Sequence, residues 1–130
     1  MKVGFYTVDT RHFEDGTTIN IVELGNQLPF VVKRVYSLVL NQAGVKRGAH
    51  AHLNQTQLLY ALSGHCIAKV WNQFGQMQSF DLSNSGQGLL LPQNHWIEIE
   101  ALQPSVLVCL ASEHYQNLQT LYNKSQFLNQ

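Results

Sequence analysis

The sequence predicts an all-β protein, an antiparallel β-sandwich or jelly roll that ends in one short helix. Three features support this: short runs rich in β-branched and aromatic residues, turn residues between them, and strict alternation in one run. The alternation is clearest where Ile97, Ile99 and Ala101 share one face. The expected strands cover residues 2–7, 17–23, 31–40, 57–62, 65–71, 77–82, 88–91, 96–101 and 105–111.

Turn signals made of Gly, Asn, Asp and Ser separate these strands, at residues 14–16, 63–64, 72–75 and 84–86. After the last strand, Ser112 can cap a helix. The apolar stripe of that helix is expected to hold Tyr115, Leu118, Leu121 and Tyr122.

The composition excludes several classes of protein. The chain has 130 residues without a linker or repeat, so residues 1–130 are expected to form one domain. Only 12% of residues are charged and the formal net charge is zero, which argues against nucleic-acid or membrane-surface binding. No apolar run approaches a membrane span, and the amino terminus does not resemble a signal peptide. Cys66 and Cys109 lack metal-site spacing and indicate buried thiols, so we expect a cytoplasmic protein.

The candidate chemistry lies in residues 44–64, around the segment Arg47-Gly48-Ala49-His50-Ala51-His52. In an extended strand, residues two apart project from the same face, so both imidazoles should point into one space. Ala49 and Ala51 should take the other face. A pair of histidines suits either metal ligation or proton transfer near neutral pH.

The spacing resembles the first cupin motif, G-x5-H-x-H-x4-E-x6-G, and therefore implies a cupin-type jelly roll. Gly44, His50, His52 and Gly64 fall at matching positions, but Gln57 stands where the metal-binding glutamate would be. A neutral amide is a poor ligand for a transition metal beside two histidines.

The second cupin motif, G-x5-P-x-G-x2-H-x3-N, is matched only by Gly86 and Pro92. Asn94 occupies its second glycine position and Ile97 its metal-histidine position. Two of the four expected ligands are therefore absent, and no metal is expected. A three-histidine metal site that uses His95 with the histidine pair remains an alternative.

A cupin without its metal that carries R-G-x-H-A-H resembles the sugar-nucleotide 3,4-ketoisomerases, which are related to the WxcM-like carboxy-terminal domain. The resemblance covers nearly the whole chain. Its other matching pieces are Pro29-Phe30, Arg34-Val35-Tyr36, Gln57, Gly64, Gly88-Leu89, Pro92, Trp96, Leu110-Ala111-Ser112, Tyr115 and Phe127. The chain departs from the family at Leu53, where lysine is common, and at 119–124, where the family's D-Y-I-R-x-Y segment has an arginine.

This resemblance implies an isomerase that converts a dTDP-4-keto-6-deoxyhexose to its 3-keto isomer, for deoxy- and amino sugars of surface glycans such as lipopolysaccharide O-antigen. The C3 proton lies next to the C4 ketone, so its removal gives an enediolate. The reaction needs a base and a proton carrier but no redox cofactor. Hydrogen-bond donors can replace a metal in stabilising the oxyanion.

The expected catalytic residues are His50, His52 and Tyr36. His50 is the preferred base at C3, and the other two are the preferred proton carriers or oxyanion donors. The assignment between the two histidines stays open.

The expected substrate-binding residues include two cations and two further side chains. Arg47 and Arg34 are candidates for the diphosphate, because a guanidinium fork fits two oxygens. Trp96 follows the Pro92 turn, where its ring can line the mouth of the pocket, and Gln57 completes the set.

The family resemblance also implies a homodimer that pairs through its amino-terminal strands. Two other functions remain open. One is a degenerate cupin that binds a sugar nucleotide without turnover, and the other is a metal-dependent cupin enzyme that uses His50, His52 and His95.

Overall fold

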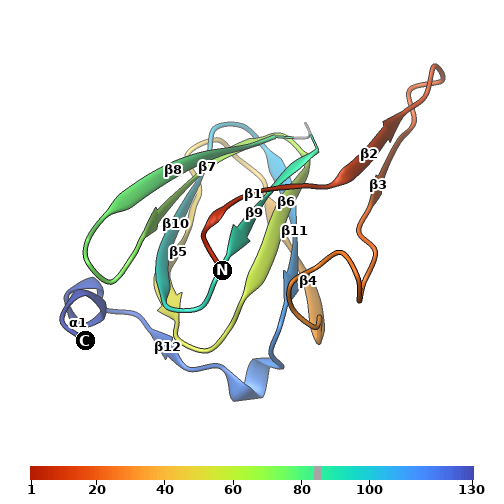
Figure 1. The fold of residues 1–130 in the computed structure, drawn as a ribbon. Coiled ribbons are helices and arrows are strands. Elements are labelled where there is room, and N and C mark those ends of the chain that lie inside the picture. Colours follow the sequence, from red (N-terminus) through yellow and green to blue (C-terminus); the bar gives the residue numbers. More distant parts are fainter. Residues whose placement is uncertain (84–85) are drawn as a thin grey trace.

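Two antiparallel five-stranded sheets pack face to face (Figure 1). The computed structural model describes residues 1–83 and 86–130. The first sheet has the order β1-β9-β6-β11-β4, with bounds Gly4–Thr7, Gln87–Leu91, Gln57–Ser63, Ser105–Ala111 and Arg34–Leu40. The second has the order β12-β5-β10-β7-β8, with bounds Thr120–Leu121, Lys46–His52, His95–Ala101, His65–Trp71 and Met77–Ser83. The predicted antiparallel jelly roll is therefore confirmed.

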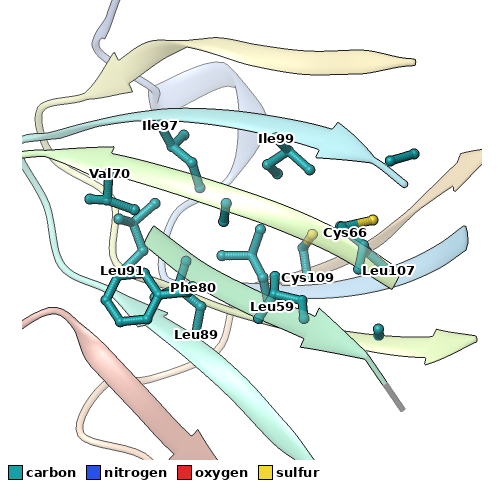
Figure 2. Packing of buried hydrophobic residues seen from close by; sticks show 14 of the residues in the cluster. Leu59, Cys66, Val70, Phe80, Leu89, Leu91, Ile97, Ile99, Leu107 and Cys109 are labelled. Atoms are coloured by element: carbon teal, nitrogen blue, oxygen red, sulfur yellow. The ribbon is translucent and has the colours of Figure 1, made fainter. Parts of the chain in front are cut away.

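The core lies between the two sheets and consists of their inward-facing side chains. Figure 2 shows Ile97 and Ile99 of β10 among buried residues of β6, β7, β8, β9 and β11. Ile97, Ile99 and Ala101 are each at most 4% exposed, which confirms the alternation predicted for this strand. Cys66 and Cys109 are free thiols inside this core.

Most strands agree with the prediction, and β7 and β11 have the expected bounds. The structure adds β2 (Asp9–His12), which pairs with β3 (Thr18–Ile21) in a hairpin that projects from the sandwich (Figure 1). The β2 sequence is polar throughout and offers no apolar alternation that would signal a strand. The predicted turn at 84–86 includes residues 84 and 85, which lie outside the described part of the chain.

The helix predicted after Ser112 is wrong in its position. The chain forms only a single 3-10 turn at Tyr115–Asn117, continues extended, and pairs through β12 with the edge of β5. Leu53 N donates to Gln119 O at 2.8 Å beside this pairing. Hydrogen bonding to the sheet edge thus outweighs the helical spacing of the apolar residues.

The short terminal helix is α1 (Lys124–Leu128), which covers the outer face of the second sheet. Its N-cap is Asn123, whose side chain accepts a hydrogen bond from Gln126 N. Phe127 is fully buried, with its ring centroid 6.0 Å from that of Trp96. Of the described helices, none is long and apolar enough to cross a membrane.

Candidate active site

A cavity of about 360 Å³ opens at one end of the sandwich. Inward-facing side chains of β4, β5, β6, β9 and β10 form its wall, and the segment between β11 and α1 borders it. Its polar lining residues are Arg34, Tyr36, Arg47, His50, His52, Gln57, Tyr115 and Tyr122. Six of the seven residues predicted for the site are in this group.

The histidine pair lies on β5 as the alternation predicted, but Ala49, expected on the opposite face with Ala51, is exposed in a bulge. The ring centroids of His50 and His52 are 4.5 Å apart, and both residues line the cavity. Ala51 between them is fully buried on the opposite face, against Trp96 and Phe127. Both imidazoles therefore face one space.

A β-bulge sets the position of His50. The β5–β10 register shifts here: His50 pairs with Ile97, whereas Gly48 pairs with Glu98, and Ala49 adopts a φ of 59°. Gly48 has a φ of 91°, and a Cβ on it would lie 2.7 Å from the carbonyl oxygen of Ile97. Only glycine fits at this position, so the Gly before the histidines has a structural reason.

Burial keeps both histidines neutral at pH 7. It is the largest cause of the lowered pKa of His50, with a smaller effect of Arg47 in the same direction and an opposing hydrogen bond to the Gly48 backbone. Burial lowers the pKa of His52 to about 4, with His50 and Arg34 adding to the effect. A neutral imidazole has a free lone pair and can therefore accept a proton.

Tyr36 lies on β4 and donates a hydrogen bond from its hydroxyl to Gln57 Oε1 at 2.8 Å. Gln57 is 3% exposed, and its side chain lines the cavity. Burial, followed by the neighbouring Cys109, raises the pKa of Tyr36 above its usual range. The phenol therefore stays protonated and remains a hydrogen-bond donor.

Arg34 is half-buried at the start of β4 and is held by several contacts. Its guanidinium carbon lies 4.9 Å from the ring centroid of Tyr36 and 5.6 Å from that of Tyr115, and Nη2 donates to Gln55 Oε1 at 3.1 Å. Arg34 Nε and Gln55 Nε2 are buried and have no hydrogen-bond partner among the described residues. The guanidinium is thus fixed in place and retains unused hydrogen-bonding capacity.

The mouth of the cavity carries further charge. Arg47 is exposed there and also lines an adjoining hollow of about 600 Å³ together with His50 and Tyr122. This hollow adds the ammonium groups of Lys46 and Lys69 and the carboxylates of Glu98 and Glu100. The two spaces share Arg47, His50 and Tyr122 among their lining residues.

Trp96 lies away from the cavity, so the expectation that its ring lines the mouth is wrong. It is 3% exposed on the outer face of β10, packs under Phe127, and donates from Nε1 to Glu98 Oε2 at 2.8 Å. The alternation that turns Ile97 inward turns Trp96 outward.

His95 is also not among the cavity residues. Its Nδ1 lies 3.0 Å from Gln93 O and 3.2 Å from Pro92 O, at the turn before β10. Within residues 1–83 and 86–130, no three His, Cys, Asp or Glu side chains are grouped closely enough to share a metal ion. The three-histidine alternative therefore has no matching cluster in the described structure.

Several site residues have no clear signal in the sequence. Tyr115 and Tyr122 border the cavity from the carboxy-terminal segment, where the sequence predicted a helical stripe. Gln55 holds Arg34, and Thr120 Oγ1 lies 2.9 Å from His52 Nδ1. Each of these contacts joins segments distant in the sequence, so local spacing does not reveal it.

The chain is similar to known sugar isomerases along its length. It is 30% identical over 95 residues to the TDP-4-oxo-6-deoxy-alpha-D-glucose-3,4-oxoisomerase of Aneurinibacillus thermoaerophilus, which covers 72% of this chain and 68% of that protein. A 3,4-ketoisomerase from Helicobacter canadensis has a similar structure, with a TM-score of 0.86, 26% identity, and coverage of 99% of this chain and 96% of the other. The WlaRB TDP-quinovose 3,4-ketoisomerase from Campylobacter jejuni is also similar in structure, with a TM-score of 0.85, 27% sequence identity and coverage of 98% of each chain.

The family described as FdtA: WxcM-like, C-terminal matches residues 2–130. This match includes both sheets, the histidine pair and the carboxy-terminal segment. The chain therefore belongs to the FdtA family of WxcM-like C-terminal domains.

Proposed function

We propose that this protein is a sugar-nucleotide 3,4-ketoisomerase that converts a dTDP-linked 4-keto-6-deoxyhexose to its 3-keto isomer. The observation that carries the proposal is the neutral histidine pair, 4.5 Å between ring centroids, in a cavity that also holds a protonated tyrosine. Family membership and the relatives' activity point to the same reaction.

The reaction moves one proton from C3 to C4 and shifts the ketone from C4 to C3. His50 accepts the proton from C3, and the C3–H electron pair forms the enediolate with negative charge on the C4 oxygen. A hydrogen bond from His52 stabilises that oxygen, and Tyr36 adds a second one when its single O–H turns from Gln57 Oε1 to the substrate. The O3 proton passes through His52 to O4, and the proton held by the histidine pair is then donated to C4, which completes the isomer and leaves both rings neutral.

The two arginines are proposed to bind different parts of the substrate. Arg47 at the mouth binds the diphosphate, whereas Lys46 of the adjoining hollow is already paired with Glu100 at 3.8 Å. Arg34 is expected to contact substrate as well, and its place against Tyr36 suits oxygens of the sugar better than the diphosphate. Gln57 acts through Tyr36, whose hydroxyl it holds.

The test is turnover of dTDP-4-keto-6-deoxyglucose, followed by proton NMR in heavy water. The purified protein should form the 3-keto isomer and exchange the C3 hydrogen with solvent. His50→Asn should lower kcat by about 10²–10⁴-fold and suppress the exchange. Saturable binding of the intact substrate with neither turnover nor exchange would instead establish a non-catalytic binding protein.

The proposal extends to a cytoplasmic homodimer that serves surface-glycan synthesis. Large apolar side chains are exposed on the amino-terminal strands and on β4, which is an edge strand of its sheet: Phe5 is 52% exposed, Val35 61% and Val39 59%. Phe13, next to β2 in the projecting hairpin, is 50% exposed. Because β1 and β4 form opposite edges of the first sheet, these residues make two separate surfaces, and a second copy paired through the amino-terminal strands would cover the one with Phe5 and Phe13.

A further inference from the structure

Thr120 brings a hydroxyl onto one of the two cavity histidines from far along the chain. Its Oγ1 lies 2.9 Å from His52 Nδ1, and the two residues are 68 positions apart. They are direct partners in the β12–β5 register, so their side chains stand on the same side of the sheet. For His52 Nε2, the described part of the chain supplies no hydrogen-bond partner, which leaves this nitrogen to a bound molecule.

The chain around Thr120 is fixed on both sides. Before it, Leu53 N donates to Gln119 O at 2.8 Å, and the Asn54 side chain bonds both Asn117 O at 2.8 Å and Gln119 N at 3.0 Å. After it, α1 is anchored by Phe127, which is fully buried. The hydroxyl is therefore held against the imidazole by the backbone and does not depend on a flexible loop.

The contact with Thr120 links the tautomer of His52 to the direction of one hydrogen bond. A neutral imidazole has one N–H donor and one acceptor nitrogen, whereas a hydroxyl can play either part. In the proposed reaction, His52 must offer an N–H to the oxygens of the enediolate, and Nε2 is the nitrogen that is free to do so. Nδ1 must then be the acceptor.

We propose that Thr120 is a positioning residue for His52, whose hydroxyl donates to Nδ1 and so keeps the imidazole proton on Nε2, facing the substrate. The inference rests on the proposed function for its kinetic consequence, but the tautomer itself is independent of turnover. The lowered pKa of His52 agrees with it, because the ring must be neutral to accept a hydrogen bond at Nδ1.

The direct test is ¹⁵N NMR of histidine-labelled protein at pH 7.5, with His52 assigned through His52→Asn. The wild type should show Nδ1 unprotonated and Nε2 protonated. A proton on Nδ1 would overturn the proposal, whether or not the protein is active. This measurement needs no variant of Thr120 that folds.

The kinetic test compares Thr120→Val, which removes the hydroxyl at nearly equal volume, with Thr120→Ser, which keeps it. Thr120→Val should lower kcat by about 10–100-fold with KM within about twofold, because misplacing a catalytic group costs rate rather than affinity. Thr120→Ser should recover most of the rate. The matched control is Thr18→Val, which removes a similar contact to His12 Nδ1, 3.1 Å long, on the exposed hairpin.

A double-mutant cycle separates positioning from a merely structural role. If Thr120 acts through His52, adding Thr120→Val to His52→Asn should lower the residual rate no further. A full additional loss, or an equal loss in Thr120→Ser and Thr120→Val, would contradict the proposal. If the wild type itself does not turn over substrate, the proposed function fails, and the NMR result still decides the tautomer.

Discussion

The lowered pKa of His52 predicts an acid-sensitive fold. The folded-state pKa is about 4, compared with 6.5 for an ordinary histidine. Between these values the unfolded chain binds more protons than the folded one, so stability is complete above pH 6.5 and declines as the pH falls toward 4. The full difference corresponds to about 3 kcal/mol at about 1.4 kcal/mol per pKa unit. Because solvent reaches part of the ring, we expect on the order of 1–2 kcal/mol.

The assay is urea unfolding at pH 7.5, 5.5 and 4.5, at one protein concentration, for the wild type and His52→Asn. Other groups also titrate over this range, so the informative quantity is the difference between the two proteins. The wild type should lose on the order of 1–2 kcal/mol more than the variant. The pKa of His50 is also lowered, so the stability of the variant should still decrease to some extent as the pH falls. The exposed His114→Asn is the control. Equal losses in the wild type and His52→Asn would refute the assignment of a buried, neutral His52.

Four further predictions follow from the site and the fold. His52→Asn should slow net isomerisation yet retain some exchange of the C3 hydrogen in heavy water, if His52 acts mainly on the oxygens and at C4; complete loss of exchange only in this variant would make His52 the base. Chelator-treated enzyme should keep its rate, because Gln57 and Ile97 stand at two ligand positions of the motif; stoichiometric bound zinc, iron or manganese whose removal abolishes activity is the opposing result. Phe127→Ala should lower the free energy of unfolding by about 3–5 kcal/mol because the side chain is fully buried, whereas Leu128→Ala on the same helix, 37% exposed, should have a much smaller effect; equal effects in urea unfolding would argue against the packing of α1. Sedimentation at micromolar concentration should give a dimer, and a monomer there would contradict the homodimer.

The strands and the histidine pair are predictable because alternation is a local property. Inward Ile97 and Ile99 on β10, and paired imidazoles on β5, both follow from a side-chain period of two. The same rule places Trp96 outside, so the sequence already contained the evidence against its role at the mouth.

The carboxy-terminal segment is not predictable from local spacing. Tyr115, Leu118 and Tyr122 have helical intervals, yet they border the cavity from a single 3-10 turn and the extended chain after it. The conformation of this segment is set by the edge of β5, where backbone groups form hydrogen bonds with β12. A long-range pairing of this kind leaves no mark in the segment itself, and the contact of Thr120 with His52 depends on it.

The two replaced ligand positions explain how a metal-type motif becomes a proton-transfer site. Ile97 of β10 is the direct partner of His50 of β5 and is 3% exposed. The chain therefore has a buried apolar side chain at the position where the motif has a metal-binding histidine. Such neighbours remove water from the histidines, and burial is the largest cause of their lowered pKa values. Gln57, in place of a glutamate, accepts the Tyr36 hydroxyl without bringing a negative charge that would hold the imidazoles protonated. Both replacements thus favour a neutral base beside a protonated donor, which is the pair of groups that enolisation next to a ketone requires.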